Sequence, residues 1–431
     1  MIVQKIKILK ELIKFNDLDG YIVPKNDEYF SEYSFPNRLK TISNFSGSAG
    51  FALILKKKNF LFVDGRYLIQ AKIESGKNFD IIEIPKLWPK DILKKYNKKL
   101  NIGFDPHLFT GKTLNRYFSN ICNLFPITKN FVDLIHKERV KKSISPFYNL
   151  KTKITGESIK SKVNRLLNKM KKANIDNIFI SAPENVAWLL NLRGNDNPHS
   201  PIPNCKVILS KNKKIFFFSD SKKINQIKKM PPYKKFSFCN YKDFFNVVNK
   251  LYGKNFCIDS LTCSVFYEAL IKSKFNIKYF IDPLYSMKSI KNSTEIENMK
   301  KVHIYDGVAL TKFIYWIKNI KKINLSELDV EKKLENLRKR NKNYLYPSFN
   351  TIAGSGPNSA IIHYRASKLS NKKIKKDHLL LLDSGGQYKY GTTDVTRTLC
   401  FNKPQNKIKN IFTKVLKGHI AVAQTNLNKI K

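Results

Sequence analysis

Four short segments of the chain occur twice in the same order, and this duplication constrains the fold more than any other feature. Each copy is an apolar stretch with an aspartate at or near its end, as in LKELIKFNDLDGYIVP and LLNKMKKANIDNIFIS. The matched aspartates are Asp19 with Asp176, Asp64 with Asp220, Asp105 with Asp259, and Asp133 with Asp282, at offsets of 157, 156, 154 and 149 residues. Apolar strands that end in aspartate are common in α/β proteins, but the shared order and the slow drift of the offset favour two related domains.

The duplication divides the chain into three parts. Residues 1–145 are predicted to form one α/β domain, residues 156–289 a second, related one, and residues 292–431 a third domain. Apolar runs of strand length alternate with amphipathic stretches in the first two parts. We therefore expect each of them to have helices that flank a mixed sheet with an antiparallel hairpin.

The third part begins with helical patterns and continues with strand patterns. Thr294 and Glu297 have the spacing of a capping box before a long amphipathic helix, and a second helix is expected to start at Ser326. Strands are expected at 348–353, 360–364, 379–383 and 393–400, and a last helix at about 407–424. Two helices followed by strands predict an α+β domain.

Two aspartates in the stretch LLLLDSGGQYKYGTTDVTRTL point to the chemistry of this part. Asp383 ends a run of four leucines, and Asp394 stands in an alternating segment, which predicts two buried strands with a carboxylate on each. Asp383 alone could be a turn former. A carboxylate in a strand needs a partner, and Arg397 points to the other face from Asp394 under a period of two. Two converging carboxylates are a natural seat for hard divalent metal ions.

His363 is the third candidate, in the segment AGSGPNSAIIHYRAS, and is expected at the end of the preceding strand. Taken alone, a hydrogen-bonded strand histidine is the favoured interpretation. In an antiparallel sheet, however, it could reach the edge of the aspartate pair and bind a substrate carbonyl or stabilise a tetrahedral intermediate. Two metal ions that activate a water beside it would perform metal-assisted hydrolysis, most simply of an amide.

Composition argues against several other classes of protein. The net charge is +47, but the lysines are spread along the whole chain with no run longer than Lys56 to Lys58, and arginines are few, so compositional bias is favoured over nucleic-acid binding. The six cysteines lack C-x-x-C spacing, which predicts reduced, buried thiols in a cytoplasmic protein. We find no signal-peptide pattern at the N-terminus and no apolar stretch approaching the ~18 residues of a membrane span.

Seven segments, in order, resemble the Xaa-Pro aminopeptidases (aminopeptidase P) of the pita-bread metallopeptidase family in their longer, three-domain form. They include NFSGSAGFA, VDGRYLIQA and VAWLLNLRGNDNP, and the most specific are IIHYR and DSGGQYKYGTTDVTRT. The resemblance covers essentially the whole chain. It implies two related creatinase-like N-terminal domains followed by a pita-bread catalytic domain, in agreement with the duplication.

The resemblance also implies an activity and a set of site residues. The family releases the N-terminal residue from short peptides with proline at the second position and uses two divalent ions, often Mn²⁺. Asp383 matches the family's first metal-binding aspartate, Asp394 the aspartate that bridges both metals, and His363 the histidine that binds substrate and relays a proton. In the family, the N-terminal domains narrow access to the site and build a dimer, so the resemblance implies a homodimer here as well.

One departure from the family concerns its remaining metal ligands, a histidine and two glutamates. From Val395 to Lys431 the sequence has no Asp or Glu, and its only histidine, His419, lies in a helical pattern. Two aspartates cannot enforce a two-metal site. We therefore expect an incomplete catalytic domain that is inactive alone. A non-catalytic binding protein of the same fold and a prolidase-like dipeptidase are the alternatives, with a nucleic-acid binder as a distant third class.

Overall fold

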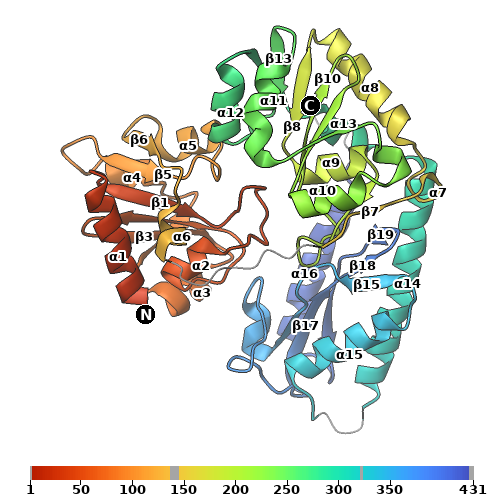
Figure 1. The fold of residues 1–431 in the computed structure, drawn as a ribbon. Coiled ribbons are helices and arrows are strands. Elements are labelled where there is room, and N and C mark those ends of the chain that lie inside the picture. The colour runs from red at the N-terminus through yellow and green to blue at the C-terminus, as the bar shows by residue number, and fades with distance from the viewer. Residues whose placement is uncertain (1, 136–144, 321–323, 427–431) are drawn as a thin grey trace. The chain divides into compact units, whose positions relative to one another are not determined.

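The computed structural model describes residues 2–135, 145–320 and 324–426, and the chain separates into two compact units at residues 1–301 and 302–431 (Figure 1). The first unit contains two six-stranded sheets, and the second contains two three-stranded sheets.

The first sheet has the strand order β4-β3-β2-β1-β5-β6. Its strands are β1 (Gly20–Pro24), β2 (Phe51–Leu55), β3 (Asn59–Asp64), β4 (Asp80–Ile84), β5 (Asn101–Phe104) and β6 (Asn123–Pro126). The helices that accompany it are α1 (Ile2–Phe15), α2 (Arg38–Ser43), α3 (Leu68–Ser75), α4 (Pro89–Leu93), α5 (Gly111–Phe118) and α6 (Phe131–Ile135).

Both faces of this sheet are buried, because successive side chains of a strand point to opposite sides. In β1, Tyr21 and Val23 pack into a core with α1, α2, α3 and α6, whereas Ile22 packs into a second core with α4 and α5. Strands covered on both sides are continuous apolar runs, which is why the sequence shows such runs here instead of alternation.

The second sheet has the strand order β12-β11-β10-β8-β13-β14. Its strands are β8 (Asn177–Ile180), β10 (Lys206–Ser210), β11 (Ile215–Phe218), β12 (Ser237–Cys239), β13 (Asn255–Ile258) and β14 (Asn276–Tyr279). The helices around it are α7 (Thr152–Thr155), α8 (Ile159–Lys172), α9 (Pro183–Leu189), α10 (Ser221–Ile227), α11 (Phe244–Lys250), α12 (Val265–Lys272) and α13 (Pro283–Ser289), with short 3₁₀ turns η1 (Pro231–Tyr233) and η2 (Tyr241–Asp243). A short pair, β7 (Tyr148–Asn149) and β9 (Leu192–Arg193), joins the start of this domain to its own body.

The two sheets have the same connectivity and the same pattern of parallel and antiparallel neighbours, which confirms the predicted duplication. The matched aspartates Asp19 and Asp176 even make the same contacts. Each exchanges hydrogen bonds with the residue that begins the neighbouring parallel strand, Asn101 in the first domain and Asn255 in the second. A carboxylate that ties two strand starts together explains why aspartate recurs at this point of both repeats.

The last of the four predicted matches is wrong in register. The counterpart of Asp282 is Asn130, not Asp133, because each of these side chains accepts a hydrogen bond from the N–H two residues on, at the start of a helix. Asn130 also donates to Asp105, and the N–H of Asp282 donates to the corresponding Asp259. Asp133 lies one turn into α6 and pairs with Arg38 at 2.8 Å.

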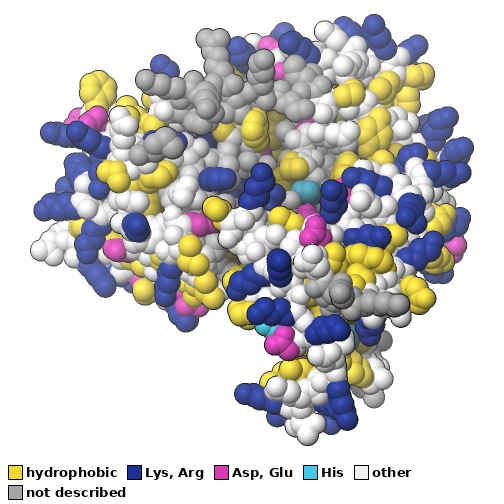
Figure 2. Space-filling model, turned by 90° about the horizontal axis from the view of Figure 1, so that it is seen from below, with side chains coloured by type: hydrophobic (Ala, Val, Ile, Leu, Met, Phe, Trp, Pro, Cys, Tyr) yellow, Lys and Arg dark blue, Asp and Glu magenta, His cyan; other side chains and the backbone are white. Residues whose placement is uncertain are grey.

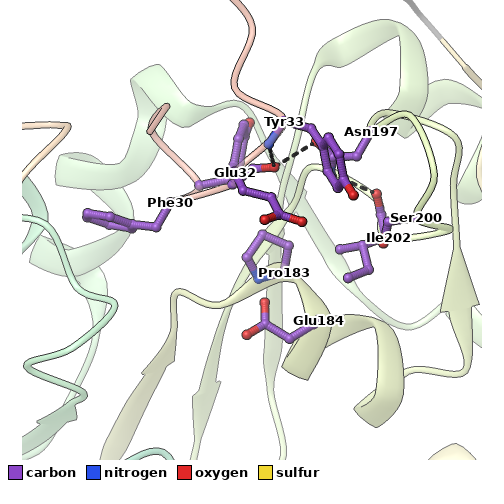
Figure 3. A pocket seen from close by; sticks show the side chains of 10 residues that line it. Phe30, Glu32, Tyr33, Pro183, Glu184, Asn197, Ser200 and Ile202 are labelled. Atoms are coloured by element: carbon purple, nitrogen blue, oxygen red, sulfur yellow. Dashed lines mark hydrogen bonds between the residues drawn. The ribbon is translucent and has the colours of Figure 1, made fainter. Parts of the chain in front are cut away.

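Polar contacts connect the two domains within the first unit. The Tyr29 and Tyr241 hydroxyls lie 3.0 Å apart, Ser31 is hydrogen-bonded to Asn197, and the buried Lys206 ammonium donates to the carbonyl of Glu28. Beside these contacts is a cavity of about 200 Å³ that residues of both domains line (Figure 3). The two domains therefore meet through hydrogen bonds and aromatic rings.

The second unit begins within the long helix α14 (Ser293–Lys318). It continues through α15 (Glu327–Lys339), β15 (Tyr344–Pro347), β16 (Ile352–Ser355), the 3₁₀ segment η3 (Gly356–Ala360), β17 (Leu379–Ser384), β18 (Gly386–Tyr388), β19 (Gly391–Thr392), β20 (Val395–Cys400) and α16 (Asn406–Ala423). One sheet has the order β16-β17-β20 and the other β15-β18-β19. Buried residues of α14 and α15 pack against β16, β17 and β20.

Several expectations for this unit are confirmed and others are wrong. The helix expected at Ser326 is capped by that residue with Asp329 as its partner. The capping box of α14 is formed by Asn292 and Glu295, not by Thr294 and Glu297, because Asn292 accepts from the Glu295 N–H at 2.9 Å and Glu295 accepts in return at 3.0 Å. The strand expected at 360–364 does not form. Residues up to Ala360 lie in η3, and a turn follows.

The surface agrees with the dispersed charge of the sequence. On the face shown in Figure 2, Lys and Arg side chains are scattered among apolar and neutral ones over many elements. All six cysteines are free thiols; four are buried, and Cys239 and Cys400 are partly exposed. No helix in the described ranges is long and apolar enough to cross a membrane.

We expect Asp282 to make the stability of the second domain depend on pH. Burial raises the pKa of this carboxyl to about 6; the charge of Asp259 adds to the rise, and hydrogen bonds from Leu284 and Asn185 oppose it. Because the folded-state pKa lies above the unfolded-state value, the stabilisation is complete below about pH 4 and is lost as the pH rises through about 6. The free energy of unfolding of the wild type relative to Asp282→Asn should fall by about 2 to 3 kcal/mol between pH 4 and pH 7. Chemical denaturation at a series of pH values measures this difference, and a constant difference would contradict it.

Candidate metal centre

Strands β17 and β20 bring the two predicted aspartates to one end of a sheet. The strands are antiparallel neighbours, with Asp383 opposite Thr396 and Ser384 opposite Val395. Asp394 immediately precedes β20, so the expectation that it lies inside a buried strand is wrong: it is exposed, whereas Asp383 is partly buried. The predicted alternation in β20 holds in part. Val395 and Leu399 contribute to the core and Thr396 and Thr398 are exposed, but Arg397, expected on the face of Val395 and Leu399, is exposed as well.

A close backbone approach holds Asp394 beside the end of β17. The Thr393 N–H donates to the Gly386 carbonyl at 2.9 Å, and the Thr393 hydroxyl accepts from the Gly386 N–H. A Cβ atom at Gly385 would lie 2.0 Å from the Thr393 carbonyl oxygen, so only glycine fits there. The glycine pair that the sequence places between the aspartates therefore allows the two segments to touch.

Asp383 is in electrostatic contact with both other candidates. Partial burial raises the pKa of its carboxyl, the Asp394 charge raises it further, and a hydrogen bond from Thr396 at 2.8 Å and the His363 imidazole lower it. The free energy of two neighbouring carboxylates that repel each other falls when a cation binds between them. Asp383 thus lies within electrostatic range of both Asp394 and His363.

His363 reaches this region from a turn, where its backbone has a left-handed φ of 57° and its side chain is exposed. The turn is anchored by Glu327, which is fully buried at the start of α15. The Glu327 carboxylate accepts hydrogen bonds from the Ser355 and Lys372 N–H groups and from the side chains of Asn358 and Tyr364, at 2.8 to 3.2 Å. Since Tyr364 follows His363 directly, this carboxylate positions the histidine.

A buried ion pair supports the other side of the centre. Arg338 donates to both oxygens of Asp306, at 2.7 and 3.1 Å, and both residues are 2% exposed. Arg338 also donates to Ser384, and the Tyr388 hydroxyl donates to Asp306 at 2.9 Å. This network ties α14 and α15 to β17 and β18 directly behind Asp383.

These residues fit part of a metal site and do not complete one. Carboxylate oxygens suit divalent cations. A cation bound near Asp383 would also relieve the repulsion between its carboxylate and that of Asp394. Within the residues that the structure describes, however, no group of three or more His, Cys, Asp or Glu side chains is arranged to hold a metal ion. The described part of the chain contributes two carboxylates and a neighbouring imidazole.

Sequence reasoning missed Thr396 as a partner of Asp383, and it missed Glu327, Asp306 and Arg338. A signal existed for Asp306, since it stands on the same helix face as the buried Val302, Ala309 and Phe313. A charged residue on an apolar face needs a buried partner. Neither Arg338 nor Glu327 could be assigned a partner from sequence spacing.

Comparison with known protein families identifies all three parts of the chain. Models described as Creatinase/Prolidase N-terminal domain match residues 5–139 and 138–295, and the model of Metallopeptidase family M24 matches residues 297–427. The protein is therefore an M24 metallopeptidase with two creatinase-like N-terminal domains, and the predicted combination of fold classes is confirmed.

Similarity to individual proteins shows which metallopeptidases this chain belongs with. The chain is 33% identical to a probable Xaa-Pro aminopeptidase P of Paracoccidioides brasiliensis and 32% identical to one of Laccaria bicolor, in each case over 97% of this chain and 72% or 68% of the relative. It also matches the crystal structure of X-prolyl aminopeptidase from Caenorhabditis elegans, described as a cytosolic enzyme with a di-nuclear active site, with a TM-score of 0.88, 25% identity and coverage of 99% of this chain and 74% of that one. The chain belongs to the Xaa-Pro aminopeptidase P family.

The buried ion pair should dominate the stability of the second unit. In Asp306→Asn the Arg338 charge stays buried without a counter-charge, so we expect the free energy of unfolding to fall by about 3 to 5 kcal/mol. Amide hydrogen exchange in β17 and β18 measures the loss. The matched control is Glu335→Gln. The Glu335 carboxylate pairs with Lys339 at 2.7 Å on the surface of α15, so removing its charge should lower the free energy of unfolding by less than about 1 kcal/mol. Equal effects of the two variants would contradict the prediction.

Glu327→Gln should loosen the turn that carries His363 without unfolding the unit. The amide has one acceptor oxygen where the carboxylate has two, and its NH₂ group would face hydrogen-bond donors, at a cost of about 1 to 3 kcal/mol. We expect faster amide exchange in peptides that cover residues 355–372, and unchanged exchange in α14. Protection equal to that of the wild type would show that Glu327 does not hold the turn.

Proposed function

We propose that the protein is a metal-dependent aminopeptidase that releases the N-terminal residue from short peptides with proline at the second position. The observation that carries the proposal is that Asp383 lies within electrostatic range of both Asp394 and His363 at one sheet end, in a chain of the Xaa-Pro aminopeptidase P family. In this proposal Asp383 and Asp394 would hold the metal ions, and His363 would contact the substrate.

The metal chemistry is part of the proposal. Two divalent ions, which we take to be Mn²⁺, would supply an activated water and stabilise the oxyanion of the scissile amide. The chain's own contribution is orientation. Thr396 holds Asp383, the Thr393–Gly386 contact holds Asp394, and Glu327 holds the turn of His363.

The remaining parts of the proposal concern organisation and location. We propose domain limits at residues 1–145, 156–289 and 292–431, a homodimer as the functional assembly, and a cytoplasmic location. The description of the Caenorhabditis elegans relative as cytosolic supports the last point. The scattered lysines give no support to a specific nucleic-acid partner.

Non-catalytic binding by the same fold is the second candidate, because the described residues contain no group of three or more metal-ligating side chains. The retained Asp383, Asp394 and His363 weigh against it. Two carboxylates do not enforce the geometry of a two-metal site. Under either candidate, residues 1–431 by themselves should show little turnover. A chimera that continues the chain with the matching C-terminal segment of the Laccaria bicolor relative separates the two candidates, because only the aminopeptidase becomes active when the ligands are completed.

We expect residues 1–431 with Mn²⁺ to leave Ala-Pro-Ala intact and the chimera to release alanine from it, measured by mass spectrometry. Asp394→Asn in the chimera should lower kcat at least about 100-fold, since loss of a ligand should exceed the 10–100-fold effect of losing an outer partner. Asp377→Asn, which changes an exposed aspartate of the same unit, is the control and should retain full activity.

Three outcomes would redirect the assignment. Turnover by residues 1–431 alone would show that the described ligands suffice. Cleavage of the dipeptide Ala-Pro but not of Ala-Pro-Ala would indicate a prolidase. A folded chimera that binds Mn²⁺ weakly and cleaves neither peptide would favour the non-catalytic alternative.

A further inference from the structure

A second cavity lies within the segment that the second Creatinase/Prolidase N-terminal domain model matches, residues 138–295. It has a volume of about 770 Å³, within the range of small-molecule pockets. Its walls come from the segment 149–152, the start of α8, the turn between β10 and β11, and residues 231–236. Nothing in the proposed peptidase reaction uses these segments.

The floor of this cavity is apolar and continuous with the core of the domain. Ile215 and Val163 are 7% exposed and belong to that core, and Ile159 and Phe236 pack against it. A ligand body that covers this floor would remove apolar surface from water, which is favourable in proportion to the area covered.

The rim carries one sign of charge. Among the side chains that line the cavity are Lys151, Lys160, Lys213, Lys234 and Lys235, and none is acidic. All five are exposed, and across the described ranges none of their ammonium groups has a carboxylate within 4 Å. The carboxylate next to the start of α8, Glu157, is already bonded to Arg165 and Ser161. The positive charge of the rim is therefore not neutralised by the protein.

Buried hydrogen bonds hold the walls together. The Tyr233 hydroxyl, in a fully buried side chain, accepts from Asn149 at 2.7 Å and donates to the Leu190 carbonyl at 2.9 Å. Asn191 donates to the carbonyl of Glu157, and its own carbonyl accepts from the Leu150 N–H. The cavity is thus preformed, so binding need not order its walls.

We propose that this cavity binds a small amphipathic organic anion, with an apolar body on the floor and a carboxylate, sulfonate or phosphate group among the rim lysines. A floor without charge and a rim with only positive charge complement the two ends of such a molecule. The volume suits a single small molecule, not a nucleic-acid strand, and the lining contains no arginine.

The test uses the full chain with labelled isoleucine and valine methyl groups and a matched pair of probes. We expect the methyl signals of Ile159, Val163 and Ile215 to shift saturably with 8-anilinonaphthalene-1-sulfonate. The uncharged N-phenyl-1-naphthylamine should bind the same methyl groups at least about 10-fold more weakly. Binding of the anion should also weaken between 50 and 300 mM salt, because exposed charges are screened.

Two pairs of substitutions separate the rim from the general charge of the protein. The double variant Lys234→Gln, Lys235→Gln should bind the anion about 5- to 10-fold more weakly than the wild type and bind the neutral probe with unchanged affinity. Lys171→Gln with Lys172→Gln, at the exposed far end of α8, makes the same charge change and should alter neither affinity.

The proposal is overturned if both probes bind equally, if the rim variant binds the anion like the wild type, or if the shifts are confined to methyl groups of α16 such as Ile411. None of these measurements involves peptide hydrolysis, so the result stands apart from the proposed peptidase function.

Discussion

The buried ion pair between Asp306 and Arg338 is the constraint on which the second unit depends. Removing two charges from water is costly, and the cost is offset only when every polar atom finds a partner. Here Ser384 and Tyr388 supply the additional hydrogen bonds. Because neighbouring residues of a strand face opposite sides, anchoring Ser384 on the buried side presents Asp383 on the other. The position of the candidate ligand therefore follows from an interaction behind it.

The same logic applies to the histidine. An exposed residue with a left-handed backbone holds its place only if the segments beside it are fixed, and the Glu327 carboxylate fixes them from inside the domain. Two buried carboxylates, Asp306 and Glu327, are fully used in hydrogen bonding, while Asp383 and Asp394 are left to repel each other nearer to solvent. That contrast separates the acids that build the unit from those available to a cation.

The two N-terminal domains show how a duplicated fold diverges. The strand connections and the Asp19 and Asp176 contacts are retained, because each closes the start of a sheet. At the start of the matched helices, however, the first domain has the amide of Asn130 and the second has the carboxylate of Asp282. The carboxylate titrates with a raised pKa where the amide cannot titrate. The second domain also has its own cavity with a rim of lysines.

The sequence by itself determined the three-part organisation, the duplicated sheets, the helix capped by Ser326 and the acid pair with its glycines. These features depend on residues close in the chain, or on a pattern that repeats along it. It was wrong about the strand at 360–364, the buried setting of Asp394 and the cap of α14. Only the tertiary structure decided that Arg338 meets Asp306 and that Glu327 meets Tyr364, residues 32 and 37 positions apart. Periodicity indicates which face of a helix is buried, but a buried charge finds its partner through packing between elements, and no local pattern contains that information.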